Sequence, residues 1–270
     1  MNEMAVSDYK GVFIFAQQVD NKITGVSYEL IGKGKALAAD LGTEVTAVLL
    51  GYQVGDLTKK LAKYGADRVI VVDDPALETY MTEPYAYAMT EVIKAHKPEV
   101  VLYGATAIGR DMAPRVSARV HTGLTADCTQ LVIGDHTDPK TKTDYKNLLY
   151  QIRPAFGGNI IATILCPEHR PQMATVRPGV MQRISPIEGA ECKVENFELK
   201  DIAAHKNVEI VEVIKKVSEK MDIQDAKVLV SGGRGVGCPE NFKMLEELAE
   251  ALGGTISSSR ACVDAGWVEK

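Results

Sequence analysis

Residues 43–74, TEVTAVLLGYQVGDLTKKLAKYGADRVIVVDD, decide the fold of the first part of the chain. The apolar run that ends at Gly51 is typical of a buried strand, and so is DRVIVVDD (67–74). Between them, DLTKKLAKYG (56–65) predicts a helix that ends at Gly65, because glycine is favoured just after a helix. Two strands joined by one helix predict a parallel sheet, since only antiparallel strands can be joined by a tight turn.

The same alternation continues on both sides of this stretch. GVFIFA (11–16) predicts a strand, and SYELIGKGKALAADLG (27–42) predicts a helix that ends at Gly42. Downstream, residues 82–97 predict a helix stopped by a proline, and EVVLYGA (99–105) predicts another strand. We therefore expect an α/β fold whose parallel strands lie at 11–16, 44–50, 68–72 and 99–103.

After residue 125 the sequence becomes rich in short β segments separated by Gly, Pro and Asp. These segments are TADCTQLVI (125–133), NLLYQIRP (147–154), NIIATILCP (159–167) and QMATVRPG (172–179). They predict antiparallel additions to the sheet, and the polar HTDPKTKTD (136–144) predicts a hairpin tip.

The chain is long enough for two domains of roughly 100–200 residues each. Residues 208–217, VEIVEVIKKV, predict an edge strand or a bridge, and 218–226 resembles a linker in composition. We therefore expect an α/β domain at 1–205, a bridge at 206–226, and a second domain that begins at 227 and runs to 270.

Composition excludes several classes of function. The net charge of −5 argues against a nucleic-acid binder, which would carry a basic surface. No apolar run is long enough for membrane insertion, and the first residues do not resemble a signal or transit peptide, so a cytoplasmic location is expected. The five cysteines contain no C-x-x-C, and the histidines show no metal-binding spacing, so no metal site is predicted. No catalytic Ser/His/Asp or Cys/His set is recognisable either.

The strongest local motif is SGGRGVG (231–237), which lies between a predicted strand and a predicted helix from about Pro239 to Leu252. Glycines at such a position let backbone N–H groups approach an anion, and Arg234 adds donors suited to phosphate. The spacing matches neither the G-x-G-x-x-G nor the P-loop pattern. A Gly-rich turn with a solvated arginine remains the alternative.

A second motif, Ser257 to Arg260, follows the next predicted strand. In a parallel sheet, its hydroxyls and its arginine would face the same crevice as Arg234. A surface loop rich in serine is the alternative.

Other arginines are interpreted as structural. We expect Arg110 or Arg115 to pair with Asp111. We expect RPAFGGN (153–159) to form a shaped turn that packs closely or reaches a cofactor or a partner chain.

Four long segments resemble the alpha subunit of the electron transfer flavoproteins. They are GATAIGRDMAPRVSARVHTGLTADCTQL (104–131), RPAFGGNIIATI (153–164), QMATVRPGVM (172–181) and VLVSGGRGVGCPENFKMLEELAEALGGTISSSRACVDAGW (228–267). They follow the family order over most of the chain.

This resemblance implies a nucleotide-hydrolase-like first domain that contacts a beta subunit through 104–111 and 153–159, and the start of a doubly wound FAD-binding domain. Gly233 and Arg234 of the GGRG motif would contact FAD, as would Ser259. Arg260 would lie near the flavin ring, where a fixed cation favours the reduced anionic flavin and raises its potential. The family continues past DAGW (264–267) with segments that supply most FAD contacts, whereas this sequence ends at Lys270, so we expect an incomplete FAD site.

The resemblance implies an electron carrier that takes electrons from flavin dehydrogenases of the acyl-CoA dehydrogenase type. Within the family, the alternative is a subunit of an electron-bifurcating complex that uses NADH and ferredoxin, in which a second FAD lies in the beta subunit. From other classes, the first domain could be a nucleotide-binding or ATP-hydrolysing module with GATAIGRD (104–111) as its phosphate loop, or a purely structural scaffold.

Overall fold

A computed structural model describes residues 8–155, 160–214, 223 and 226–268. The chain divides into two compact units, Met1–Glu209 and Ile210–Lys270. This division falls inside the segment 206–226 for which a bridge is predicted; the domain limits themselves stay a prediction. Of that bridge, Val208–Ile214 forms no strand, and most of the rest lies outside the described residues.

The first unit is built on a seven-stranded sheet in the order β12-β5-β4-β1-β6-β11-β7, and all of its strand pairs are parallel. Its strands are β1 (Val12–Phe15), β4 (Val45–Gly51), β5 (Arg68–Asp73), β6 (Val100–Gly104), β7 (Leu124–Cys128), β11 (Gln172–Val176) and β12 (Lys193–Asn196). The α/β class and the four parallel strands expected from the sequence are confirmed.

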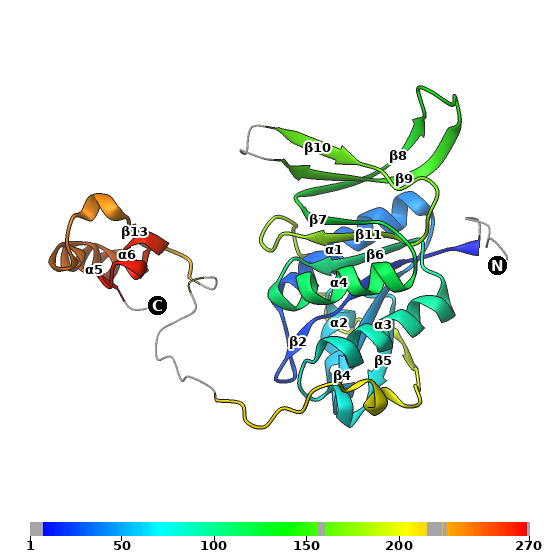
Figure 1. The fold of residues 1–270 in the computed structure, drawn as a ribbon, viewed down its shortest axis with the longest axis horizontal. Coiled ribbons are helices and arrows are strands. Elements are labelled where there is room, and N and C mark those ends of the chain that lie inside the picture. The colour runs from blue at the N-terminus through cyan, green and yellow to red at the C-terminus, as the bar shows by residue number, and fades with distance from the viewer. Residues whose placement is uncertain (1–7, 156–159, 215–222, 224–225, 269–270) are drawn as a thin grey trace. The chain divides into compact units, whose positions relative to one another are not determined.

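Helices cover both faces of this sheet (Figure 1). Residues of α1 (Gly25–Leu41) and α2 (Thr58–Lys63) pack in one core, and those of α3 (Thr82–His96) and α4 (Ala107–Arg119) pack in the other. Strand β1 contributes alternate side chains to the two cores, which is why its sequence is apolar throughout. Helix α1 ends at Gly42 with φ 62°, as its position in the sequence predicts.

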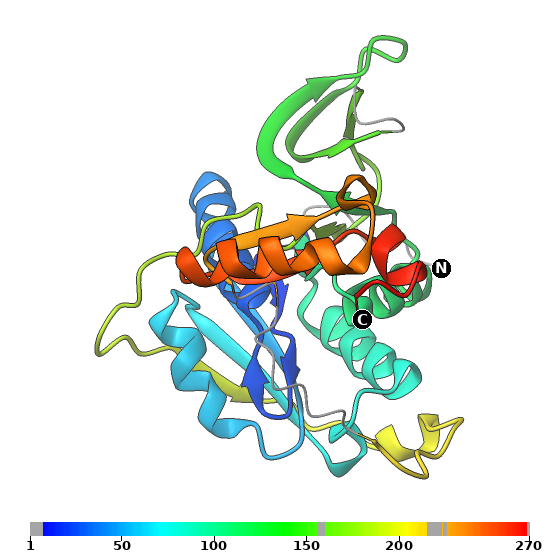
Figure 2. The ribbon, with the colours of Figure 1, turned by 90° about the vertical axis from the view of Figure 1, so that its left-hand side faces the viewer.

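A smaller antiparallel sheet in the order β10-β9-β8 extends beyond the β7 edge (Figures 1 and 2). Its strands are β8 (Gln130–Thr137), β9 (Asp144–Pro154) and β10 (Ile161–Ile164). The antiparallel additions expected at 147–154 and 159–167 and the hairpin tip are thus confirmed. A separate short hairpin pairs β2 (Gln18–Val19) with β3 (Lys22–Ile23).

Two segments expected among the antiparallel additions belong to the parallel sheet instead. Strand β11 lies between β6 and β7, and all five of its residues are buried. The segment 125–133 splits into β7, which is parallel to β11, and β8, which is antiparallel to β9. The two strands are separated at Thr129, and Asp127, near the end of β7, adopts a left-handed backbone with φ 61°. Turn residues mark the ends of a strand but not its partner, so the sequence pattern could not make this distinction.

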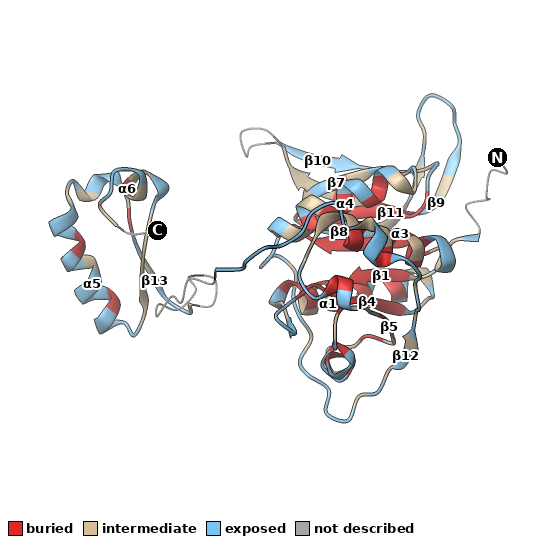
Figure 3. Cartoon of the chain, turned by 60° about the horizontal axis from the view of Figure 1, so that its bottom comes forward, coloured by how far each residue is buried: buried red, intermediate tan, exposed pale blue. Residues whose placement is uncertain are grey.

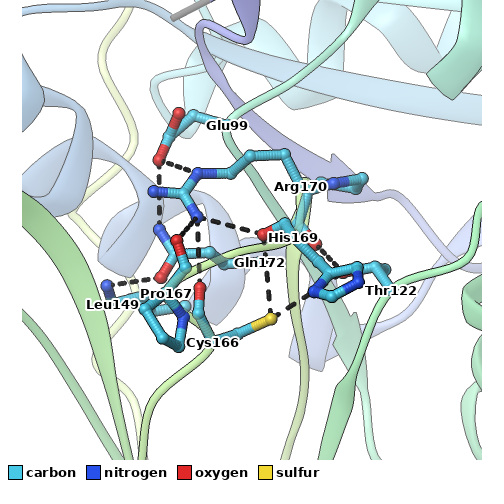
Figure 4. Close-up of polar contacts among 9 residues, drawn as sticks. Glu99, Thr122, Leu149, Cys166, Pro167, His169, Arg170 and Gln172 are labelled. Carbon is cyan, nitrogen blue, oxygen red and sulfur yellow. Dashed lines mark hydrogen bonds and ion pairs between the residues drawn. The ribbon is translucent and has the colours of Figure 1, made fainter. Parts of the chain in front are cut away.

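A buried polar network joins the two sheets at the amino end of β11 (Figure 4). The Arg170 side chain is only 4% exposed, and its Nε donates to Glu99 Oε1 at 2.5 Å. Gln172 donates to the same carboxylate and accepts a hydrogen bond from the backbone N–H of Leu149 in β9. The Nη1 of Arg170 donates to three carbonyl oxygens of the preceding loop, those of Cys166, Pro167 and His169.

The second unit is a single strand–helix–strand arrangement within the described residues. Strands β13 (Leu229–Gly232) and β14 (Thr255–Ser258) are parallel, and α5 (Phe242–Ala251) connects them; α6 (Arg260–Asp264) follows. The predicted helix is confirmed, with its first residues in a 3-10 turn, Pro239–Asn241. Strand β13 is largely exposed rather than buried, because one neighbouring strand and one helix cover little of it.

No helix among the described residues is long and apolar enough to span a membrane.

Candidate functional site

The carboxyl ends of β13 and β14 lie side by side. The strand register places Gly232 opposite Ser258, and the backbone N–H of Ser259 donates to the carbonyl of Gly232 at 2.9 Å. The chain leaves both strands at this edge, first into Gly233 and Arg234 and then into Ser259 and Arg260. The structure therefore brings together the four residues singled out from the sequence, at the edge of a parallel sheet where ligands bind.

The glycines of this loop serve two different purposes. A Cβ on Gly232 would lie 2.6 Å from the ring of Phe242 and 2.8 Å from Leu245, so only glycine lets α5 pack this closely on β13. By contrast, a Cβ on Gly233 would meet nothing nearer than Ser259 Oγ at 3.9 Å, and one on Gly235 would meet nothing within 4 Å. The space beside Gly233 and Gly235 is therefore open to a ligand, while the N–H groups of Val236 and Gly237 donate within the loop to the carbonyls of Gly233 and Arg234.

Two arginines and a hydroxyl surround this open loop. Arg234 is exposed, and its side chain makes no hydrogen bond or ion pair with another described residue. The Arg260 side chain is 92% exposed, and its Nε lies 3.3 Å from Asp264 Oδ2. Ser259 is also exposed, and its Oγ lies 3.5 Å from Cys262 Sγ. Open space beside the loop, with two accessible guanidinium groups, fits an anionic, phosphate-bearing cofactor such as FAD.

The corresponding loop of the first unit uses the N–H groups of Ala105 and Gly109 within the fold. Thr106 Oγ1 accepts from the N–H of Gly109 at 3.1 Å and donates to Gln17 Oε1 at 2.6 Å. The N–H of Ala105 donates to the carbonyl of Val176 at 2.7 Å. A phosphate loop needs unoccupied backbone donors, and these contacts use donors within GATAIGRD (104–111) for the fold itself.

A cluster of charged residues around Asp127, which the sequence did not predict, lies farther along the same edge of the first unit. Asp127 in β7 pairs with Arg177, which directly follows β11, and Arg110 of α4 lies 3.8 Å from the same carboxylate. The expected pairing of Arg115 with Asp111 is present at 4.0 Å. No sequence signal links Asp127 to Arg177, because only the pairing of β7 with β11 brings them together.

Two further expectations concern the turn at 153–159 and metal binding. Residues 156–159 of the turn lie outside the described residues, so its shape is not tested. Within the part of the chain that the structure describes, no group of three His, Cys, Asp or Glu side chains is placed to hold a metal ion.

Comparison with known proteins supports the reading of both units. Residues 12–202 match the family described as the electron transfer flavoprotein domain. Residues 222–270, which contain the open loop, match the electron transfer flavoprotein FAD-binding domain.

Curated relatives align along almost the whole chain. The electron transfer flavoprotein subunit alpha of Clostridium acetobutylicum is 48% identical over 271 residues, covering 99% of this chain and 77% of the relative. The Protein FixB of Clostridium saccharobutylicum is 47% identical over 98% of this chain and 76% of its own length. The lactate dehydrogenase (NAD(+),ferredoxin) subunit LctC of Acetobacterium woodii is 40% identical over 97% of this chain and 60% of its own length. The chain therefore belongs to the electron transfer flavoprotein alpha subunit family.

Proposed function

We propose that this chain is the FAD-binding alpha subunit of an electron carrier that pairs with a beta subunit and accepts electrons from flavin dehydrogenases of the acyl-CoA dehydrogenase type. The observation that carries the proposal is the open, arginine-flanked loop at 233–237 inside the segment that matches the FAD-binding family. The proposal places the chain in the cytoplasm.

FAD, when bound, supplies the redox centre that accepts and releases electrons. The role of the chain is to hold and tune this cofactor. Arg234, whose side chain has no hydrogen-bond or ion-pair partner among the described residues, binds the cofactor through charge-assisted hydrogen bonds, and the hydroxyl of Ser259 lies at the neighbouring strand end. Arg260 supplies a positive charge that favours a reduced, anionic flavin. Electron transfer between cofactors needs no catalytic acid or base, so the proposal makes the chain a carrier and not an enzyme.

The assignment of Arg234 and Arg260 is tested in the complete complex with a beta subunit. Replacing Arg234 by alanine removes a charge-assisted contact worth about 1.5–3 kcal/mol, so FAD affinity should fall about tenfold or more. Arg260→Ala should mainly lower the flavin midpoint potential, because it removes a cation that stabilises the reduced form. Lys243→Ala on the exposed surface of α5 is the matched control. Unchanged FAD content and potential in both arginine variants would contradict the assignment.

The beta subunit would contact the first unit through 104–111 and 153–159. The first segment leads into α4, and the second begins in the last residues of β9. Co-purification of the chain with a beta subunit tests the pairing. Residues 1–209 form a compact unit with its own cores, so binding should persist in a variant that lacks FAD.

A second candidate function is favoured by one relative. The name of the Acetobacterium woodii protein includes both NAD(+) and ferredoxin, which fits an electron-bifurcating complex. The two candidates differ in a direct assay of the complex. A bifurcating complex reduces ferredoxin with NADH only when a second, higher-potential acceptor is present, whereas a simple carrier does not react with NADH.

A further inference from the structure

Four elements of the first unit bring charged side chains together at the carboxyl edge of the seven-stranded sheet. Asp127 belongs to β7, and Arg177 follows the last residue of the neighbouring β11. Arg110 lies in the first turns of α4, directly after β6, the other neighbour of β11. Arg153 extends from β9 of the smaller sheet. In parallel sheets this edge is where ligands bind.

Asp127 is the centre of this cluster. Arg177 holds its carboxylate in a two-pronged contact, with Nε 3.2 Å from Oδ1 and Nη2 2.7 Å from Oδ2. Arg110 Nη2 lies 3.8 Å from Oδ1. The backbone of Asp127 is left-handed and its N–H donates to Thr175 Oγ1 at 2.8 Å, at an irregularity in the pairing of β7 with β11. Such irregularities redirect side chains, and here the carboxylate points toward the arginines.

The cluster carries more positive than negative charge. The hydrogen bond from Arg177 lowers the pKa of Asp127, and the charges of Arg177, Arg110 and Arg153 act in the same direction. Two guanidinium groups therefore lie within 4 Å of one carboxylate and the charge of a third, Arg153, also acts on it, in a chain whose net charge is −5. The side chains of Arg110 and Arg177 are 61% and 46% exposed, so each retains N–H donors that face solvent.

We propose that Arg110, Arg153 and Arg177 form a binding site for a phosphate group at this edge of the first unit. Guanidinium groups match the geometry of phosphate oxygens through paired hydrogen bonds, and a dianion balances the two positive charges that Asp127 leaves uncompensated. The site differs from a phosphate loop, because side chains supply the donors while backbone donors of the adjacent loop are used internally.

The phosphate can come from two sources, inorganic pyrophosphate or the diphosphate of a nucleotide. Titration calorimetry of the full chain with pyrophosphate and with ADP, at one fixed ionic strength, separates them. Equal affinities indicate that the phosphates alone are recognised, and tighter binding of ADP indicates a nucleotide. The chain is titrated without a beta subunit, so the result does not depend on whether Arg110 and Arg153 also lie in a subunit contact.

Variants that are expected to change the affinity for pyrophosphate in opposite directions test the site itself. Arg110→Gln and Arg177→Gln should each weaken pyrophosphate binding about tenfold, the effect of losing a charge-assisted contact. Asp127→Asn should strengthen it, because asparagine tolerates the left-handed backbone while the competing negative charge is removed. Arg183→Gln, an exposed arginine outside the cluster, is the matched control and should leave binding unchanged.

Two results would overturn the proposal. The first is that neither pyrophosphate nor ADP shows saturable binding up to about 10 mM. A specific site with this charge should have a dissociation constant below that concentration. The second is binding that Arg110→Gln and Arg177→Gln leave unchanged. Arg110 is an exposed helix residue, so its variant stays folded and interpretable even if Arg177→Gln disturbs the edge of the sheet.

Discussion

The close approach of α4 to β6 depends on a single residue, Gly109. A Cβ at this position would lie 1.8 Å from the carbonyl oxygen of Gly104, which is backbone and cannot move aside independently. Gly109→Ala should therefore lower the free energy of unfolding of the first unit by about 2 kcal/mol or more, despite the better helix propensity of alanine. Gly25→Ala is the control, because a Cβ there meets nothing within 4 Å. Urea unfolding followed by circular dichroism measures both, and equal stabilities would contradict the predicted clash.

The buried network around Arg170 supports a second prediction at the residue scale. Removing one partner of a buried ion pair leaves the other charge uncompensated, so Arg170→Met should cost about 3–5 kcal/mol of unfolding free energy. Adding Glu99→Leu to that variant should recover part of the loss, because the isolated carboxylate is then also removed. Lys193→Gln, which breaks an exposed pair with Glu44, should cost less than about 1 kcal/mol. A double variant as unstable as Arg170→Met alone would show that the carboxylate is not the source of the cost.

At the scale of elements, the sequence predicts strands and helices well and their partners less well. Strand β1 could be placed because its continuous apolar run indicates burial on both faces, and the single helices on either side predict parallel pairing. Strand β11 is equally buried, but it follows the antiparallel strands β8, β9 and β10. Nothing in its own sequence therefore shows that it inserts between β6 and β7. The open loop at 233–237 could be predicted because its two strands are consecutive. The Asp127 cluster could not, because its members come from four separate elements.

The segment that follows β12 is anchored to α3 by apolar burial, by ring contacts, including that of Phe197 with His96, and by a hydrogen bond from Tyr87 to the carbonyl of Lys200. Ile202 is 1% exposed and packs in the core shared with α3, while the rings of Tyr87 and His205 stack at 3.8 Å. Ile202→Ala should lower the stability of this docking by about 2–4 kcal/mol and make 197–205 accessible to proteases. Ile214→Ala is the control, since that side chain is 83% exposed and contributes no burial. Limited proteolysis with mass spectrometry distinguishes the two, and equal cleavage would argue against the anchor.

At the scale of the whole molecule, the two units differ in how much apolar surface they bury. The first unit has two cores, one on each face of its sheet. The second has Phe242, Ala249 and Cys262 as its buried apolar residues among those described, and most of α5 is exposed (Figure 3). Its aliphatic side chains remain substantially exposed: Leu229 at 43%, Leu248 at 48% and Leu252 at 55%. Exposed apolar surface of this kind, beside unpaired strand edges, is typical of a unit that is completed by contact with another surface.

This difference predicts how each unit behaves in the isolated chain. So small a unit, with a two-stranded sheet and one main helix, buries too little apolar area to be stable without support. Backbone amides of β13 and β14 should therefore exchange with deuterium within seconds to minutes, while those of β4 and β6 should stay protected far longer, because only global unfolding of the first unit exposes them. Hydrogen exchange with mass spectrometry measures the exchange rates of both units in one sample, so β4 and β6 serve as the internal control. Since Arg234 and Ser259 depend on the pairing of β13 with β14, the isolated chain should also retain FAD poorly. Slow exchange at 229–232 and 255–258 would show instead that this arrangement is stable by itself and preorganised for its cofactor.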